Sequence, residues 1–301
     1  MKVEEFEIEG IPPGYQVFDV DLTPSGRPVA TVGHPIDAST AAYALSGDVR
    51  IELPTESICY TKERNGELYA HVRCAGEEHV VVAFPRVDED GEINAWTFGP
   101  AGQLVGEFHA GDDIQELLAS ERWVVAFYSD EGQLGDIRLS NQAMSVLGLD
   151  GSLLWGHRSH FPQGQRLETW FHAACWMNED DIGVFADVET GGVLPGQCSF
   201  LEINVRNRTQ TIRRPPGHIA RPDAVTASPG GLIRVHGLIA DFMTNRRAPE
   251  IVEWDPSRGS NRVVGEYEDD SSRKHPVLRG LPGGRFIAPT PDGYRILSFD
   301  D

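Results

Sequence analysis

The chain has 301 residues, of which 40% are hydrophobic and 24% are charged, so it contains enough apolar material for a sizeable core. Aspartate and glutamate number 46 against 26 lysines and arginines, which gives a formal net charge of -20. This balance disfavours nucleic acids and membranes as partners, because phosphates and anionic lipids repel a strongly acidic protein. No apolar run approaches the about 18–20 residues of a membrane-spanning helix.

The N-terminal residues 1–7 are acidic and alternating, and lack the positive and apolar regions of a secretory signal. The four cysteines show no C-x-x-C spacing: Cys59, Cys74, Cys175 and Cys198. We therefore predict reduced, mostly buried thiols in a cytoplasmic bacterial protein, with one disulfide as the alternative.

Short segments rich in Val, Ile, Phe, Tyr and Trp recur along the chain, separated by Gly, Pro, Asn and Asp. The best helix candidate, residues 112–120, fits a strand equally well. The composition therefore predicts an all-β protein. In chain order, similar hairpins are expected over residues 43–51, 96–106, 146–155, 200–212 and 251–265.

The turns between these segments are periodic. One class recurs at roughly fifty-residue intervals, at Gly26, Gly76, Ser120, Glu179, Gly230 and Gly283. A second class joins the hairpins, at Gly47, Gly102, Gly151, Asn207 and Gly259. Such a period indicates repeats of four strands each.

The sixth repeat has only three candidate strands, at residues 277–281, 285–288 and 294–299. Its missing fourth strand is matched by Val3–Ile8 at the other end of the sequence. Pairing the two ends removes an unpaired edge, which would otherwise promote aggregation. We predict a single domain over residues 1–301, a six-bladed β-propeller whose last blade is closed by the N-terminal strand.

Two alternatives to six blades stay open. Residues 57–65 fit no strand position well, so seven blades are possible. A pair of β-sandwich sheets is the competing architecture.

The segments 111–114 and 123–132 resemble uncharacterised bacterial propeller proteins, and the whole chain is similar to the NHL-like and quinoprotein-like propeller superfamilies. The resemblance implies a closed propeller. It matches no family of known function, and propellers host enzymes, lectins and scaffolds alike, so function must be argued from a site.

In a four-stranded blade, the connections between the second and third strands emerge on the same face as the connections between blades. Here both sets are long and polar, for example over residues 129–142, 158–168, 187–197 and 214–222. Long loops gathered on one face of a rigid scaffold usually carry binding sites. We expect the site on this face, at the mouth of the central channel.

Four connections between blades carry a histidine, at positions 109, 160, 218 and 275. The sharper interpretation is a divalent metal ion held by His160, His218 and His275. The simpler one is ordinary surface or hydrogen-bonded histidines without a cofactor, and we take it as the main prediction. The pair His157 and His160 is expected on a loop, where three-residue spacing is a weak ligand motif.

Acidic residues of the same connections form a second candidate group: Asp112, Asp113, Asp130, Glu131, Asp136, Asp187, Glu189 and Asp241. Carboxylates can bind Ca²⁺ or act as general acid and base when two lie close together. At this net charge, solvated surface is the competing interpretation. Asp113 stands out because it lies beside an inner strand.

A third candidate group surrounds an aromatic side chain. Trp170 and His172 alternate on an inner strand and therefore point to one face. Together with His218, Arg221 and Asp223, they could bind a planar or anionic ligand. Packing between blades is the alternative.

No dinucleotide-binding glycine motif, P-loop or serine-hydrolase elbow occurs in the chain. We therefore predict a propeller that binds a protein or small-molecule ligand. Whether it is also an enzyme is left open, with a metal-assisted lyase or hydrolase as the alternative.

Overall fold

The computed structural model describes residues 1–33, 43–46, 49–53, 70–188, 198–219, 221–241, 246–268 and 278–299. Their strands form six four-stranded antiparallel sheets and one two-stranded sheet. The six sheets are the blades of a six-bladed β-propeller, which confirms the predicted fold and blade number. Residues 57–65, which raised the alternative of seven blades, lie outside the described residues.

The chain divides into two compact units. Unit 1 consists of Met1–Glu4, His160–Ala288 and Arg295–Asp301. Unit 2 consists of Glu5–Ser159 and Pro289–Tyr294.

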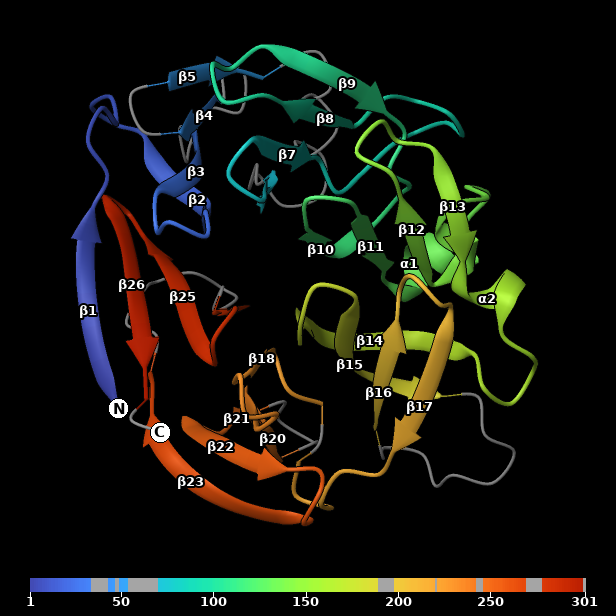
Figure 1. Ribbon diagram of the computed structural model, residues 1–301. Helices are drawn as coiled ribbons and strands as arrows, with labels where there is room; N and C mark the ends of the chain where they lie inside the picture. The colour runs from blue at the N-terminus through green and yellow to red at the C-terminus, as the bar shows by residue number, and fades with distance from the viewer. Residues whose placement is uncertain are drawn as a thin grey trace. The chain divides into compact units, whose positions relative to one another are not determined.

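Unit 2 contains three sheets, in each of which four consecutive strands pair in chain order (Figure 1). They are β2 (Gln16–Leu22), β3 (Pro28–Gly33), β4 (Tyr43–Ser46) and β5 (Val49–Glu52); β6 (His71–Ala75), β7 (His79–Ala83), β8 (Ala95–Phe98) and β9 (Leu104–Phe108); and β10 (Ile114–Ala119), β11 (Val124–Tyr128), β12 (Met144–Leu147) and β13 (Leu153–Gly156). The ambiguous segment 112–120 is therefore a strand.

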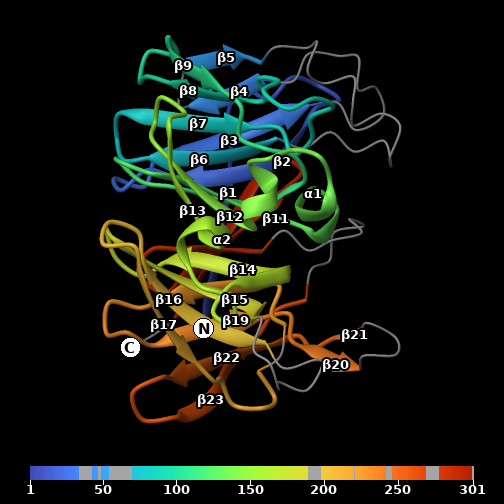
Figure 2. The ribbon, with the colours of Figure 1, turned by 90° about the vertical axis from the view of Figure 1, so that its right-hand side faces the viewer.

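Unit 1 contains two sheets of the same design, and Figure 2 shows the first of them, β14 to β17. They are β14 (Leu167–Trp176), β15 (Asp181–Val188), β16 (Ser199–Asn204) and β17 (Thr209–Arg213); and β18 (Ala224–Ala227), β19 (Ile233–His236), β22 (Glu250–Asp255) and β23 (Ser260–Glu266). A short hairpin of β20 (Ile239–Asp241) and β21 (Arg246–Arg247) is inserted between β19 and β22.

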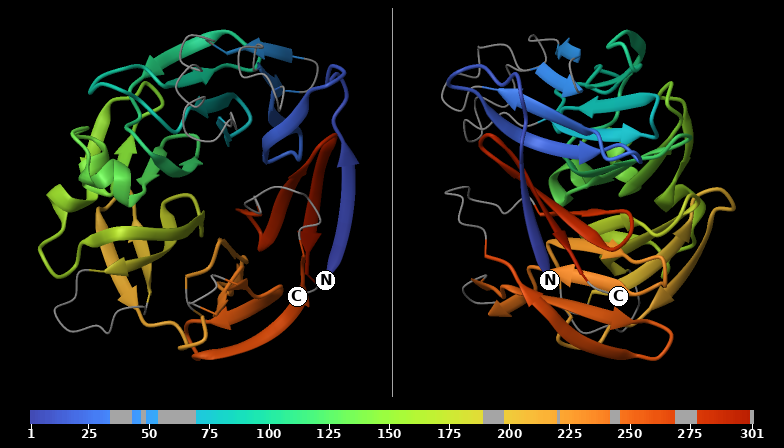
Figure 3. Two further views of the ribbon diagram at one scale, coloured as in Figure 1. Left: turned by 180° about the vertical axis from the view of Figure 1, so that it is seen from behind. Right: turned by 60° about the vertical axis from the view of Figure 1, so that its left-hand side comes forward.

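The sixth sheet combines the two ends of the described sequence, with the strand order β1-β26-β25-β24 (Figure 3). Its strands are β1 (Lys2–Glu7), β24 (Arg279–Leu281), β25 (Arg285–Thr290) and β26 (Gly293–Ser298). The first strand thus pairs with the last, as the turn count predicts.

The outermost strand of each blade is its most exposed strand. All residues of β6, β11 and β18 are buried, whereas β17 and β23 are mostly exposed. Aromatic rings fill the spaces between neighbouring sheets of one unit. In unit 1, for example, the ring of Phe200 lies 4.9 Å from that of Phe185 and 5.5 Å from that of Trp254. Such close-packed apolar contacts stabilise the blades.

One buried ionic group connects the first strands of the three complete sheets in unit 2. The guanidinium of Arg73 on β6 forms ion pairs with Asp19 of β2 and Glu116 of β10, and the Arg73 side chain is only 4% exposed. The Arg73 guanidinium also donates hydrogen bonds to the carbonyl oxygens of Val72, at 2.6 Å, and Leu117. Every contact is internal, so this group holds the strands in register.

The structure corrects two loop predictions. The connection after β11 contains the helix α1 (Asp130–Leu134) and the 3-10 turn η2 (Ser140–Gln142). The Ser129 side chain caps α1 by accepting a hydrogen bond from the Glu131 backbone. The histidine pair predicted on a loop lies in the single-turn helix α2 (His157–His160), where His157 is buried.

Cys74, Cys175 and Cys198 are buried and form no disulfide within the described residues, and Cys59 lies outside them. Among the described segments, no helix is both long enough and apolar enough to cross a membrane.

Candidate functional site

Two groups of charged side chains lie at the blade ends where the long connections emerge. The Arg221 cluster of unit 1 consists of Trp170, His172, Asp187 and Arg221. The Arg86 cluster of unit 2 consists of Arg86, Asp112, Asp113 and Glu131. The Arg221 cluster combines residues of β14 and β15 with one residue from the connection between two blades. The Arg86 cluster combines residues from connections within blades with residues from a connection between blades.

A β-bulge on β14 assembles the Arg221 cluster. Phe171 pairs with Ala186 and Ala173 pairs with Phe185, so His172 is an extra residue without a partner position on β15. The next matched pair is Leu167 with Val188, which leaves Asp187 opposite residues 168–170. Bulges re-aim side chains in this way, and here the bulge brings Trp170 and His172 to the end of β15.

Asp187 is the centre of the Arg221 cluster. Its Oδ1 lies 3.4 Å from His172 Nε2, and its Oδ2 accepts a hydrogen bond of 3.0 Å from Arg221 Nη2. The guanidinium carbon of Arg221 lies 4.4 Å from the ring centroid of Trp170, which is a cation–π contact. Asp187 therefore orients the cation that covers the indole.

Partial burial strengthens these contacts. The side chains of His172, Asp187 and Arg221 are 11%, 14% and 16% exposed. Burial acts to raise the pKa of Asp187, but the hydrogen bonds and charges of His172 and Arg221 outweigh it and hold that pKa below its usual range. Asp187 is therefore a carboxylate at neutral pH.

The backbone of Arg221 is also held in one conformation. Its φ of +48° lies in the left-handed region, which is uncommon for residues other than glycine. Its N–H donates to the sulfur of Cys198, at 3.2 Å. Burial raises the pKa of this thiol to about 11, so the sulfur is protonated and uncharged at neutral pH. Main chain and side chain together place the guanidinium.

Trp170 differs from the other five tryptophans of the chain. It is 48% exposed, whereas the others are buried or half-buried. An indole that is half in water and lies against an oriented guanidinium offers an apolar face beside a cation. This combination suits a planar or anionic group.

The Arg86 cluster has a different composition, with three carboxylates around one guanidinium. Arg86 Nη1 lies 2.5 Å from Asp113 Oδ1 and 3.5 Å from Glu131 Oε2, and Arg86 Nε lies 3.3 Å from Asp112 Oδ1. Asp112 also accepts a hydrogen bond from the Val87 backbone, at 3.0 Å. These contacts connect three separate loops.

Asp113 is the strained member of the Arg86 cluster, because its φ is +57°. Burial raises its pKa despite the nearby cation of Arg86, and the like charges of Asp112 and Glu131 act in the same direction. The predicted site residues Asp113 and Glu131 are brought together in the structure, and Arg86, which joins them, was not predicted. Asp130 lies beside them in the first turn of α1 and takes no part in these ion pairs.

Three further predicted site residues belong to unit 1: His160, His218 and Asp223. His160 Nε2 lies 2.9 Å from the carbonyl oxygen of Arg208, and the His160 ring packs edge-on against Phe161. His218 is exposed at the surface. Asp223 is anchored through its backbone, whose N–H donates to the carbonyl oxygen of His236 at 2.9 Å.

Three predicted residues cannot be placed in a site. Asp241 belongs to β20, of which only the backbone is described, and Glu189 and His275 lie outside the described residues. Across the described ranges, no group of three or more His, Cys, Asp or Glu side chains is arranged to hold a metal ion. The metal site of His160, His218 and His275 stays a prediction.

Asp187 appeared in the sequence only as one of many loop carboxylates. Its connection to Trp170 could have been found from the hairpin between β14 and β15. Trp176 pairs with Ile182, and continuing this register places Asp187 opposite Phe171, next to both Trp170 and His172. The bulge, which shifts the register by one residue, has no comparable sequence signal.

No protein-family model and no curated protein sequence matches the chain. Solved structures do resemble it. An oligogalacturonate lyase from Vibrio parahaemolyticus has 10% identity and a TM-score of 0.50, over 98% of this chain and 96% of that one. KlAtg21, solved with the coiled coil of AgAtg16, has 9% identity and a TM-score of 0.53, over 94% and 81%.

The extracellular domain of a putative one component system from B. thetaiotaomicron has 10% identity and a TM-score of 0.48. The match covers 97% of this chain but only 42% of the other chain. At such identities the similarity shows the fold alone. The fold is a β-propeller.

Proposed function

We propose that this propeller is a binding module whose Arg221 cluster recognises a small molecule with a planar group and an anionic group. The observation that carries the proposal is the half-exposed ring of Trp170, at 48%, beneath an arginine oriented by a partly buried carboxylate. The planar part of the ligand would cover the indole, and its anion would lie beside the guanidinium.

The expected energies favour this ligand class. Covering about 100 Å² of indole surface contributes roughly 2.5 kcal/mol, from about 25 cal/mol per Å² of apolar surface. A hydrogen bond to a charged group adds about 1.5–3 kcal/mol. After the cost of association, these contributions correspond to a weak to moderate complex, which suits reversible ligand recognition.

The chemistry of the cluster supports binding over catalysis. His172 and Asp187 resemble the base and orienting acid of a nucleophilic enzyme, but such an enzyme also needs an activated nucleophile. The nearby thiol of Cys198 is buried, and with a pKa of about 11 it stays protonated. Asp187 is also engaged by Arg221, so its main effect is to position the cation.

Isothermal titration calorimetry with three probes tests the proposal. Benzoate carries both features, cyclohexanecarboxylate lacks the planar ring, and benzamide lacks the charge. We expect benzoate to bind most tightly. We also expect Trp170→Ala and Arg221→Gln each to weaken benzoate binding at least tenfold.

Arg213→Gln is the matched control. It removes one positive charge from the same blade, at an exposed ion pair with Glu202. Its benzoate affinity should equal that of the unmodified protein. The proposal fails if Trp170→Ala binds benzoate as tightly as the unmodified protein does, or if the three probes bind equally.

A further inference from the structure

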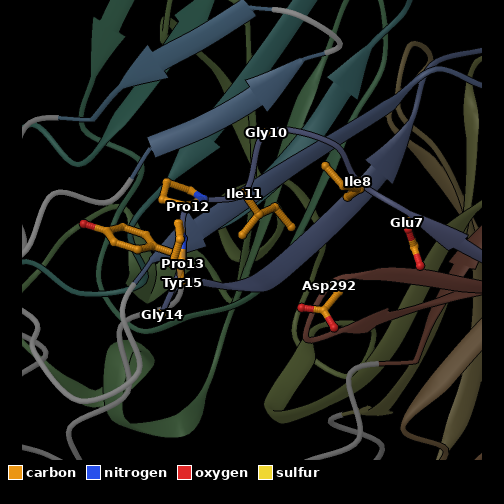
Figure 4. Close-up of a pocket in the computed structure, with 9 residues that line it drawn as sticks. All are labelled: Glu7, Ile8, Gly10, Ile11, Pro12, Pro13, Gly14, Tyr15 and Asp292. Atoms are coloured by element: carbon orange, nitrogen blue, oxygen red, sulfur yellow. The ribbon is translucent and has the colours of Figure 1, made fainter.

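A second concave site lies in unit 2, where the connection between β1 and β2 passes the turn between β25 and β26. The cavity measures about 300 Å³ and is lined by Glu7, Ile8, residues 10–15 and Asp292 (Figure 4). It shares no residue with either arginine cluster, so it is a separate feature of the molecule.

The sequence builds this cavity with a loop attached at both ends. The N–H of Ile8 donates to the carbonyl oxygen of Asp292, and the N–H of Val17 donates to that of Pro291, both at 3.0 Å. Between these points Gly10 and Gly14 have φ values of +83° and +85°, which allow two sharp changes of direction.

The loop is also stiffened internally. Pro12 and Pro13 have restricted φ angles, and the N–H of Tyr15 donates to the carbonyl oxygen of Pro12 at 3.0 Å. A wall of this kind loses little conformational freedom when a ligand binds. The cavity is therefore preformed.

The two ends of the cavity differ in chemistry. Figure 4 shows the carboxylates of Glu7 and Asp292 toward one end, the ring of Tyr15 at the other, and Ile11 between them. Among the described residues that line the cavity, none is a lysine, arginine or histidine. In the part of the chain that the structure describes, neither carboxylate takes part in a side-chain hydrogen bond or an ion pair.

We propose that this cavity binds a small organic cation, a primary alkylammonium ion. Its ammonium group would lie between Glu7 and Asp292, and its alkyl chain would cover Ile8, Ile11 and the prolines. Two carboxylates that form no ion pair with any described residue favour a cation. The volume is at the lower end of the range typical of small-molecule sites.

An alkylammonium ion fits better than a bare metal ion for two reasons. Calcium takes six to eight oxygen ligands, and within the described segments no group of three or more metal-ligating side chains is present. Part of the wall is formed by Ile8, Ile11, Pro12 and Pro13, which gain from contact with an alkyl chain but supply no side-chain ligand to a metal ion.

Titration with n-pentylammonium chloride at low ionic strength, followed by calorimetry, tests this site. Methylammonium supplies the charge without the chain, and 1-pentanol supplies the chain without the charge. We expect saturable binding of n-pentylammonium that is at least tenfold tighter than that of either fragment. Glu7→Gln and Asp292→Asn should each weaken it at least tenfold.

Glu9→Gln provides the matched control, because Glu9 is an exposed acid two residues from Glu7 that does not line the cavity. It should bind the amine like the unmodified protein. Equal losses in Glu9→Gln and Glu7→Gln would mean that overall charge alone attracts the amine, and would overturn the proposal. Absence of saturable binding, or equal affinity for methylammonium, would also overturn it.

The two proposals can fail separately. Trp170→Ala should leave n-pentylammonium binding unchanged, and Asp292→Asn should leave benzoate binding unchanged. Thermal denaturation of each variant confirms that the substitutions, which change exposed side chains, leave the fold intact.

Discussion

Arg73 in unit 2 and Arg221 in unit 1 are both oriented by aspartates on neighbouring strands or connections, yet their surroundings differ. Arg73 is 4% exposed, and its guanidinium contacts two carboxylates and two carbonyl oxygens of the chain itself. Arg221 is 16% exposed, forms an ion pair with Asp187, and lies over an indole that is half in water.

The comparison shows how one residue type acquires two roles. Protein groups from three strands surround Arg73, so its charge is paired inside the protein. Its interactions therefore connect neighbouring blades. Arg221 is held from one side by Asp187, and its other surroundings include the accessible face of Trp170. Exposure and the aromatic neighbour, rather than residue type, separate the buried group around Arg73 from the candidate site.

The largest expected effect comes from removing the buried arginine. Arg73→Met leaves Asp19 and Glu116 buried without their cation, and breaking such a group costs about 3–5 kcal/mol. Urea denaturation should show this loss in the free energy of unfolding. Arg221→Met should lose clearly less, because its surroundings are partly solvated. Equal losses of stability in the two variants would remove the distinction between the buried group around Arg73 and the Arg221 cluster.

Trp170→Ala separates binding from packing. We expect benzoate affinity to fall at least tenfold while the free energy of unfolding changes by less than about 1 kcal/mol, since a half-exposed ring contributes little packing. Calorimetry and urea denaturation measure the two quantities. A stability loss close to that of Arg73→Met would instead assign Trp170 to packing between blades.

His71, which lies near Arg73, and Asp187 of the Arg221 cluster should affect the free energy of unfolding in different pH ranges. Burial, with the nearby charge of Arg73, lowers the pKa of His71 from its ordinary 6.5. The folded protein therefore prefers neutral His71, and stability is complete above pH 6.5 and falls as the pH drops below it, by at most about 1.4 kcal/mol per pH unit. Urea denaturation between pH 7.5 and 5.5 measures this slope.

His71→Gln is the control for that slope, because glutamine keeps a donor for the carbonyl of Ile114 but does not titrate. The slope should shrink in this variant. Asp187 has a lowered pKa, so its contribution is present above its ordinary value of 3.8 and is lost only as the pH falls below that value. An unchanged slope in His71→Gln would contradict the assignment.

The smallest effect is expected at the surface. Arg213 and Glu202 form an ion pair of 2.8 Å, but their side chains are 40% and 26% exposed. Arg213→Gln should change the free energy of unfolding by less than about 1 kcal/mol, because water and salt screen exposed pairs. A larger loss would show that the geometry of an ion pair, without burial, decides how much these arginines contribute to the free energy of unfolding.

Several predictions from local patterns were confirmed. Turn residues and alternating apolar segments act over a few neighbouring residues, so they can be recognised without the fold. They predicted the hairpins of all complete blades and the pairing of β1 with β26. For β10 they allowed either a helix or the strand that the structure shows. The helix α1 was missed, although Ser129 followed by two acids is a common start of a helix.

The candidate sites were predicted only in part, because they depend on registers between distant segments. Trp170, His172 and Arg221 were grouped from the sequence. Asp187, which connects them, was not, since the bulge at His172 shifts the register of β14 by one residue. Arg86 was missed for the same reason, as its carboxylates lie about 26 and 45 residues away along the chain.

The sequence by itself determined the all-β class, the six-fold repeat and the closing strand, because the spacing of turns and the period-two alternation are properties of short segments. Only the tertiary structure decided which arginine is buried among carboxylates and which lies over an exposed indole. That difference depends on what the neighbouring strands bring within a few ångströms, and electrostatic energies change steeply over such distances and with burial.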